Sequence, residues 1–190
     1  MISIKLTDSI PVINDKIKDS IAKHLNTTIT KNKSKLESRC RSLATSWIMS
    51  QPEIKSLMSQ ETYSLYALFG LNINPQNAVS KISEAVSGSV SVEFNKINSK
   101  LSGGLKIYFQ PSSFANLLSI SEGFVKYGKG TLHWLRWLLE AGDSIIVADY
   151  SYKAETGKGR SGYGYMISGG FFRVPPEFSG TLDDNFVTRA

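Results

Sequence analysis

The sequence predicts an α+β fold in which a long N-terminal helix or helical hairpin precedes a curved antiparallel sheet packed by one or two helices. Three observations lead to this prediction. Apolar residues recur at three- and four-residue steps through the first 50 positions, which is the period of a helix. Apolar and polar residues alternate from residue 90 onward, which is the period of a strand. Helices that come first and strands that come later favour α+β over a parallel α/β fold.

The N-terminal helix is predicted to begin near residue 9. Asp8 or Ser9 can cap it, and Pro11 lies in the first turn, where its missing N–H costs nothing. Residues 26–35 fill the apolar register poorly and contain three threonines, which are weak helix formers. The sequence therefore leaves open a continuous helix of about 40 residues or a helical hairpin. A narrow apolar stripe on such an arm favours contact with a partner helix. The residues of the stripe are Ile10, Ile13, Ile17, Ile21, Leu25, Ile29, Leu36, Cys40, Leu43 and Trp47.

Shorter elements follow. Pro52 and Glu53 begin a second helix, since proline suits a first turn and an acid suits the helix dipole. Another helix is predicted over residues 76–87. The runs 90–94 and 105–109 alternate like antiparallel strands joined by a long loop. A helix is then predicted over residues 132–139, and further strands over residues 144–152, 163–167 and 171–174.

Length and charge suggest one structural domain with a basic helical arm, residues 1–60, and an α+β core with an extended C-terminal segment, residues 61–190. The net charge is +6, and residues 1–60 hold ten Lys and Arg against five Asp and Glu, a balance of +5. Such asymmetry is typical of a solvated helix face, and in some proteins it marks a polyanion or acidic partner. The candidate polyanion contacts are Lys31, Lys33, Lys35, Arg39 and Arg41.

The sequence contains no convincing catalytic or metal-binding constellation, so we expect no enzyme activity, cofactor or metal. Residues 123–129 have the spacing of a phosphate-binding loop, but Gly130 stands where a Ser or Thr should follow. We therefore expect an ordinary loop there, without nucleotide binding. The glycine-rich stretch 157–162 lies between two strands, where no helix N-terminus is available for an anion. Two histidines and the single Cys40 cannot supply the set of about four ligands that a zinc site needs. One cysteine also excludes an internal disulfide and fits a reducing compartment. No apolar run approaches the roughly 20 residues of a membrane span, so no membrane partner is expected.

The C-terminal third is rich in aromatics, paired prolines and turn glycines, which indicates a defined path packed against the chain's own core or a neighbouring subunit. Together with an earlier block it resembles a known family. The matching residues are Trp47 to Met58 with the helix start Ser50-Gln51-Pro52-Glu53, the break Leu68-Phe69-Gly70-Leu71, and the stretches Leu135-Arg136-Trp137-Leu138-Leu139, Arg160-Ser161-Gly162 and Arg173-Val174-Pro175-Pro176. They resemble those of small structural proteins from the head–tail joining region of tailed bacteriophages, of the neck or tail-completion type. Gln51 departs from the family pattern, and the first 40 residues match only in being helical.

The resemblance implies a virion protein assembled in the host cytoplasm as a ring, of six copies or a multiple of six, around the DNA channel. It implies a portal or adaptor protein on the head side, the tail tube or its terminator on the tail side, and non-specific proximity to packaged DNA. The aromatic candidates for apolar interface anchors are Trp134, Trp137, Phe172 and Phe178. The candidates for charge-assisted contacts are Arg160, Arg173 and Arg189. The alternative is a basic nucleic-acid-binding module that uses the N-terminal helix on phosphates.

Overall fold

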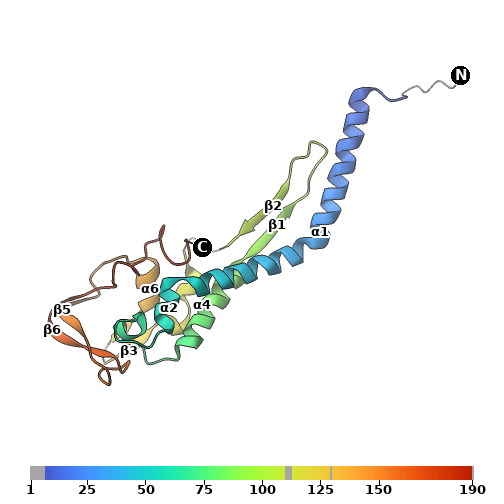
Figure 1. Cartoon of the computed structure of the whole chain (residues 1–190). Helices are drawn as coiled ribbons and strands as arrows, with labels where there is room; N and C mark the ends of the chain where they lie inside the picture. Colours follow the sequence, from blue (N-terminus) through green and yellow to red (C-terminus); the bar gives the residue numbers. More distant parts are fainter. Residues whose placement is uncertain (1–6, 110–112, 129, 190) are drawn as a thin grey trace. The chain divides into compact units, whose positions relative to one another are not determined.

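The computed structural model describes residues 7–109, 113–128 and 130–189 (Figure 1). Its architecture is α+β, as predicted: a long N-terminal helix precedes short helices and small antiparallel sheets. The chain divides into two compact units. Of the described residues, the first unit holds 7–40 and 90–108, and the second unit holds the rest. The second unit thus begins at Arg41, inside the range 1–60 that the sequence analysis assigns to the basic arm.

The first helix, α1 (Ile10–Ser50), is uninterrupted, which decides for the continuous helix over the helical hairpin. In its threonine-rich middle, two polar side chains bond to the carbonyl one turn earlier. Thr27 Oγ1 donates to the carbonyl of Lys23 at 2.9 Å, and Asn32 Nδ2 donates to the carbonyl of Thr28 at 2.8 Å. Both side chains thus find hydrogen-bond partners on the helix itself.

A β-hairpin completes the first unit. Strands β1 (Ser91–Asn95) and β2 (Gly104–Tyr108) pair antiparallel, which confirms the predicted strands and the long connection between them. The connection is tied to α1 by one side chain. Asn26 Nδ2 donates to the carbonyl of Ile97 at 2.8 Å, and the N–H of Ile97 donates to Asn26 Oδ1 at 2.8 Å. Both backbone groups of a loop residue are thus satisfied by one amide.

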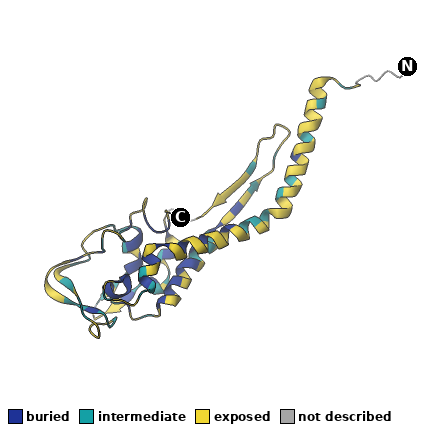
Figure 2. Cartoon of the chain, viewed as in Figure 1, coloured by how far each residue is buried: buried dark blue, intermediate teal, exposed yellow. Residues whose placement is uncertain are grey.

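Short helices form the centre of the second unit, and Figure 2 shows buried positions concentrated there. They are α2 (Pro52–Met58), α3 (Leu65–Leu68), α4 (Pro75–Ser89), α5 (Ala115–Leu118), the 3₁₀ turn η1 (Ser121–Gly123) and α6 (Trp134–Leu139). Trp134 is fully buried at the start of α6. Its Nε1 donates to the carbonyl of Glu122 at 2.8 Å, and its ring centroid lies 6.0 Å from that of Phe69. The indole N–H therefore has the partner that a buried tryptophan needs.

The strands do not form the single curved sheet that the sequence predicts. They form three separate two-stranded antiparallel sheets: β1 with β2, β3 (Val125–Tyr127) with β4 (Gly130–Leu132), and β5 (Val147–Ala154) with β6 (Gly164–Phe172). Each strand pairs with its neighbour in sequence, and helices separate the pairs along the chain.

Two local predictions are corrected in the same region. The stretch 123–129, expected to be a loop, forms η1 and β3, although Lys129 lies outside the described residues. The separate strands expected over 163–167 and 171–174 are one strand, β6. It accommodates the glycine pair Gly169-Gly170 because both residues have positive φ angles, +98° and +83°, beside a bulge in β5–β6.

The C-terminal segment, residues 173–189, packs on its own chain at the end of α6. Asn185 is fully buried, and its Nδ2 donates to the carbonyl of Leu139 at 3.2 Å. Gly180 is required because a Cβ there would lie 1.8 Å from the carbonyl oxygen of Leu138. Phe186 is also fully buried. The sequence left open whether this segment packs against the core of its own chain or against a neighbouring subunit. Asn185, Gly180 and Phe186 pack against the core of their own chain.

Candidate functional site: an apolar pocket and an exposed helix face

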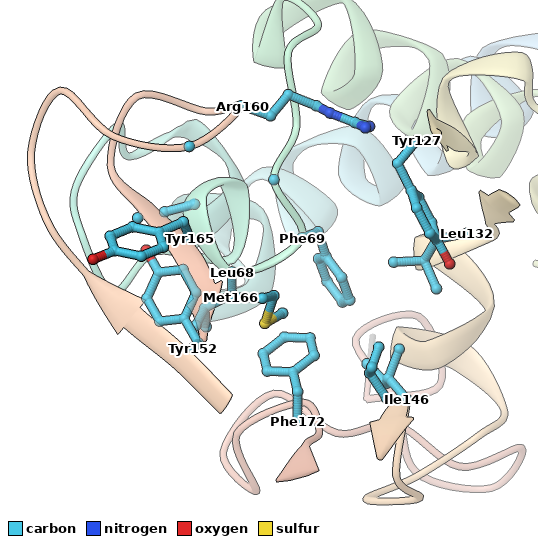
Figure 3. A pocket seen from close by; sticks show the side chains of 15 residues that line it. Leu68, Phe69, Tyr127, Leu132, Ile146, Tyr152, Arg160, Tyr165, Met166 and Phe172 are labelled. Carbon is cyan, nitrogen blue, oxygen red and sulfur yellow. The ribbon is translucent and has the colours of Figure 1, made fainter. Parts of the chain in front are cut away.

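An apolar pocket of about 270 Å³ opens in the second unit (Figure 3). Three structures surround it: the end of α3 with the following turn, the β3–β4 hairpin, and the β5–β6 hairpin. Figure 3 shows aromatic and aliphatic side chains converging on it from these elements. The lining includes Leu68, Phe69, Tyr127, Leu132, Ile146, Val147, Tyr152, Tyr165, Met166 and Phe172. Such a surface suits recognition of an apolar group.

The mouth of the pocket carries one arginine. Arg160 Nη1 donates to the carbonyl of Lys126, and the guanidinium carbon lies 5.8 Å from the ring centroid of Tyr127. The hairpin tip that carries Arg160 is tightly turned. Gly159 has φ +72°, and a Cβ on it would lie 1.7 Å from the carbonyl oxygen of Gly164. Gly159 therefore permits a close backbone approach at this tip.

The hydroxyl of Tyr152, one of the tyrosines that line the pocket, is already engaged in hydrogen bonds. Tyr152 Oη donates to the carbonyl of Thr62 at 2.6 Å and lies 3.1 Å from the carbonyl oxygen of Tyr163. Burial, and secondarily the neighbouring Tyr63, raises the pKa of Tyr152 above its ordinary value. This phenol remains protonated and serves as a structural donor. Of the described lining residues, Arg160 is the one that carries a charge.

The aromatic side chains predicted to be interface anchors lie at different depths. Trp134 is fully buried, and Phe172 is 5% exposed at the edge of the pocket. Trp137 and Phe178 are half-buried. The four side chains do not form one surface patch, because two of them belong to the interior of this chain.

The three predicted arginines are held by partners within the chain. Arg160 binds a backbone carbonyl at the pocket mouth. Arg173 Nη1 lies 3.5 Å from Asp143 Oδ2, at an exposed position. Arg189 Nη2 binds the buried carboxylate of Glu53. These contacts lie on separate parts of the second unit, so the structure does not bring the arginines together.

The predicted polyanion contacts lie on α1. Lys31, Lys35 and Arg39 are exposed and four residues apart, which puts them on one face of the helix. Lys33 is half-buried on a different face. Arg41 is exposed and belongs to the second unit.

The N-terminal half of α1 also presents apolar side chains to solvent. Four residues with the spacing of a helical face are substantially exposed: Ile10 by 70%, Ile17 by 52%, Ile21 by 42% and Leu25 by 38%. We call this set the apolar row. The sequence analysis identified the stripe, but only the structure shows that the residues described here leave it uncovered. The hydrophobic side chains of a helix in a complete fold are normally buried against a core.

The titratable groups offer little chemistry. His133 is stacked on Phe124 with ring centroids 3.9 Å apart. Burial, followed by the charge of Arg136, lowers the pKa of His133, which favours a neutral packing residue. Within residues 7–109, 113–128 and 130–189, no three His, Cys, Asp or Glu side chains are grouped to hold a metal ion. None of the described helices is both long and apolar enough to span a bilayer.

Scans against protein-family models, curated proteins and solved structures each find no match for the chain.

Proposed function

We propose that the chain is a structural virion protein of the neck or tail-completion region of a tailed bacteriophage, where copies of it form a ring that joins head to tail. In this proposal a portal or adaptor protein binds on the head side, and the tail tube or its terminator binds on the tail side. The observation that carries the proposal is the apolar row of α1, together with the sequence resemblance described above.

The apolar row supports assembly because its exposure is costly for an isolated chain. Completing the burial of a half-exposed isoleucine or leucine contributes roughly 1 kcal/mol. Contiguous exposed apolar surface on a soluble protein commonly marks a protein-binding site. A row of this kind, repeated on every copy of a ring, can be covered by a helix of a neighbour or of a joining partner.

The charges beside the apolar row do not oppose such contacts. Residues 7–25 carry equal numbers of acidic and basic side chains, so the net charge of this stretch is zero: Asp8, Asp15 and Asp19 against Lys16, Lys18 and Lys23. Lys16 already pairs with Asp8, just before α1, and Lys18 pairs with Asp15 on the same helix. Copies of this stretch can therefore approach without net repulsion.

The small sheets give a second support. Because each sheet of the described chain has two strands, every strand has one edge without a strand partner. Exposed strand edges invite pairing with another chain, and proteins usually cover them. Adjacent copies in a ring, or a joining partner, can provide that cover.

The proposal is tested by placing charges in the apolar row. The variant Ile17→Asp with Ile21→Asp should reduce the ring to smaller species when mass is measured by light scattering after size exclusion. The matched control, Thr30→Asp with Ser34→Asp, adds the same charges at exposed α1 positions outside the row. Its mass should equal that of the wild type. An unchanged mass for the first variant would contradict the role given to the row.

The alternative function is a nucleic-acid-binding module, and the observation that favours it is the aligned set Lys31, Lys35 and Arg39. Affinity for duplex DNA would then fall steeply with salt, with log affinity changing by about −0.9 per phosphate contact for each unit of log salt. Replacing the three residues with alanine would flatten that slope. A wild-type protein that assembles and shifts no DNA at low salt would exclude this alternative.

A further inference from the structure

One leucine of the C-terminal segment is exposed on an ordered turn. Leu182 is 52% exposed, whereas Phe186 in the same segment is fully buried. The turn is fixed at both ends: the N–H of Thr181 donates to the carbonyl of Asp184 at 2.8 Å, and the N–H of Asp184 donates to Thr181 Oγ1 at 3.1 Å. Asn185, itself fully buried, donates from Nδ2 to the carbonyl of Thr181 at 2.7 Å. The backbone that carries Leu182 is thus already ordered, so binding through this turn costs less conformational entropy than binding through a mobile segment.

The apolar pocket has the size and lining to receive such a side chain. Its volume of about 270 Å³ lies just below the range of about 300–1,000 Å³ that is typical of small-molecule pockets. An aliphatic side chain would contact Phe69, Met166 and Phe172 there (Figure 3). The pocket has no described carboxylate in its lining, and Arg160 stands at its mouth.

The charges around the two surfaces are opposite. Leu182 is followed directly by Asp183 and Asp184, and both are exposed. The pocket mouth carries Arg160, with Lys158 on the same hairpin tip. An inserted leucine would therefore bring carboxylates toward cations, which favours the correct partner and increases the association rate.

We infer that the pocket of one copy binds Leu182 of a neighbouring copy, with the adjacent Asp183 facing Arg160 and Lys158. This inference rests on the proposed ring and names the contact that closes it. A second copy is the expected occupant because one chain carries both complementary surfaces. Each copy then gives one leucine and receives one, the head-to-tail arrangement that produces rings.

The first test is the full-length variant Leu182→Asp, compared with Leu101→Asp. Both leucines are exposed, by 52% and 43%, and Leu101 lies in the loop between β1 and β2. We expect Leu182→Asp to shift the assembly at least tenfold toward single copies in a dilution series followed by native mass spectrometry. The control should assemble like the wild type. Matching circular dichroism spectra and melting temperatures of the single copies establish that both variants fold.

The second test locates the contact. A benzophenone amino acid at position 182 is illuminated in a mixed sample of isotope-labelled and unlabelled chains, and cross-linked peptides are identified by mass spectrometry. We expect cross-links between differently labelled chains at Met166 or another pocket residue such as Phe172. Cross-links within one chain, or to another surface of the neighbour, would overturn the inference.

The outcomes separate this inference from the proposed function. A ring that persists in Leu182→Asp overturns the leucine contact and leaves the ring intact. A small apolar molecule retained in the pocket of the wild-type ring also overturns it, because the pocket then has another occupant. A wild-type chain that forms no ring, alone or with a head or tail partner, overturns both.

Discussion

Arg189 donates a hydrogen bond from Nη2 to Oε1 of Glu53 and so ties the end of the described chain to the first turn of α2. The Glu53 side chain is fully buried, whereas that of Arg189 is 38% exposed. Among the described residues, the second carboxylate oxygen of Glu53 has no hydrogen-bond partner. Arg189 also lies 3.2 Å from Asp184, the residue that closes the Leu182 turn. The ion pair therefore anchors the segment that we infer to contact a neighbouring copy.

Replacing this arginine should destabilise the second unit. In Arg189→Ala the buried Glu53 carboxylate loses its cation, so the free energy of unfolding should fall by about 2–3 kcal/mol, somewhat less than for a fully buried pair. Urea unfolding measures the change. The double variant with Glu53→Gln should recover part of the loss, since a neutral amide is less costly to bury unpaired. The control Arg173→Ala removes a partner of Asp143 at the surface and should cost under about 1 kcal/mol. Equal losses in the two arginine variants would contradict the role of burial.

Two glycines of the β5–β6 tip should respond differently to alanine. Both have positive φ angles, +72° at Gly159 and +78° at Gly157, so each substitution strains the backbone by about 1–2 kcal/mol. Gly157 has open space for a Cβ, whereas a Cβ at Gly159 would meet the Gly164 carbonyl. Thermal unfolding should therefore show Gly159→Ala as the more destabilising variant. Its loss of unfolding free energy should exceed that of Gly157→Ala by on the order of 1–3 kcal/mol, because only Gly159→Ala adds a steric clash to the backbone strain. Similar melting temperatures for the two variants would contradict the close approach at this tip.

The Asn26 amide should control opening of the β1–β2 loop. In Asn26→Ala both backbone groups of Ile97 lose their partner, at roughly 1 kcal/mol per bond. Hydrogen exchange at the Ile97 amide should accelerate by about tenfold or more. The control Asn32→Ala removes a bond from the same helix to its own backbone and should leave Ile97 exchange unchanged. Unchanged exchange in Asn26→Ala would show that the loop is held by other contacts.

Stability should depend on pH through His133. Burial, then the positive charge of Arg136, lowers the pKa of His133 in the folded protein, against a smaller opposing effect of Glu140. The unfolded chain therefore binds a proton first as the pH falls below about 6.5. The contribution of this group is fully present above that pH and is lost as the pH falls toward the folded pKa. Melting temperatures between pH 5 and pH 8 should decline on the acidic side less in His133→Gln than in the wild type. Parallel profiles would contradict this assignment.

Local patterns were sufficient to predict much of the fold. The apolar period predicted a helix that begins near residue 9 and left a helical hairpin open, which the continuous α1 excludes, and alternation located β1 and β2. The prediction of a single curved sheet was wrong, because alternation identifies strands but not their pairing partners. The described strands pair only with their neighbours in sequence. The glycine pair in β6 was read as a break, since sequence does not reveal that a bulge can hold both residues in one strand.

The candidate site was less accessible to sequence reasoning. The pocket collects residues from segments around positions 67–70, 127–132, 146–152 and 159–172, and no local pattern links them. Trp134 and Phe172 were predicted to be interface anchors, and both are buried within this chain, because sequence does not distinguish the interior of a chain from an interface between chains. The sequence shows Leu182 followed by two aspartates, but only the fold shows that this leucine is exposed and that Arg160 lies beside the pocket.

The most direct test of the ring is native mass spectrometry of the purified full-length chain at low and moderate salt, with negative-stain imaging of the same sample. The proposed function predicts one discrete closed assembly, of six copies or a multiple of six, whose mass is the same at both salt concentrations. A chain that stays monomeric at both, and binds DNA only at low salt, would contradict it and favour the basic face of α1 as the functional surface.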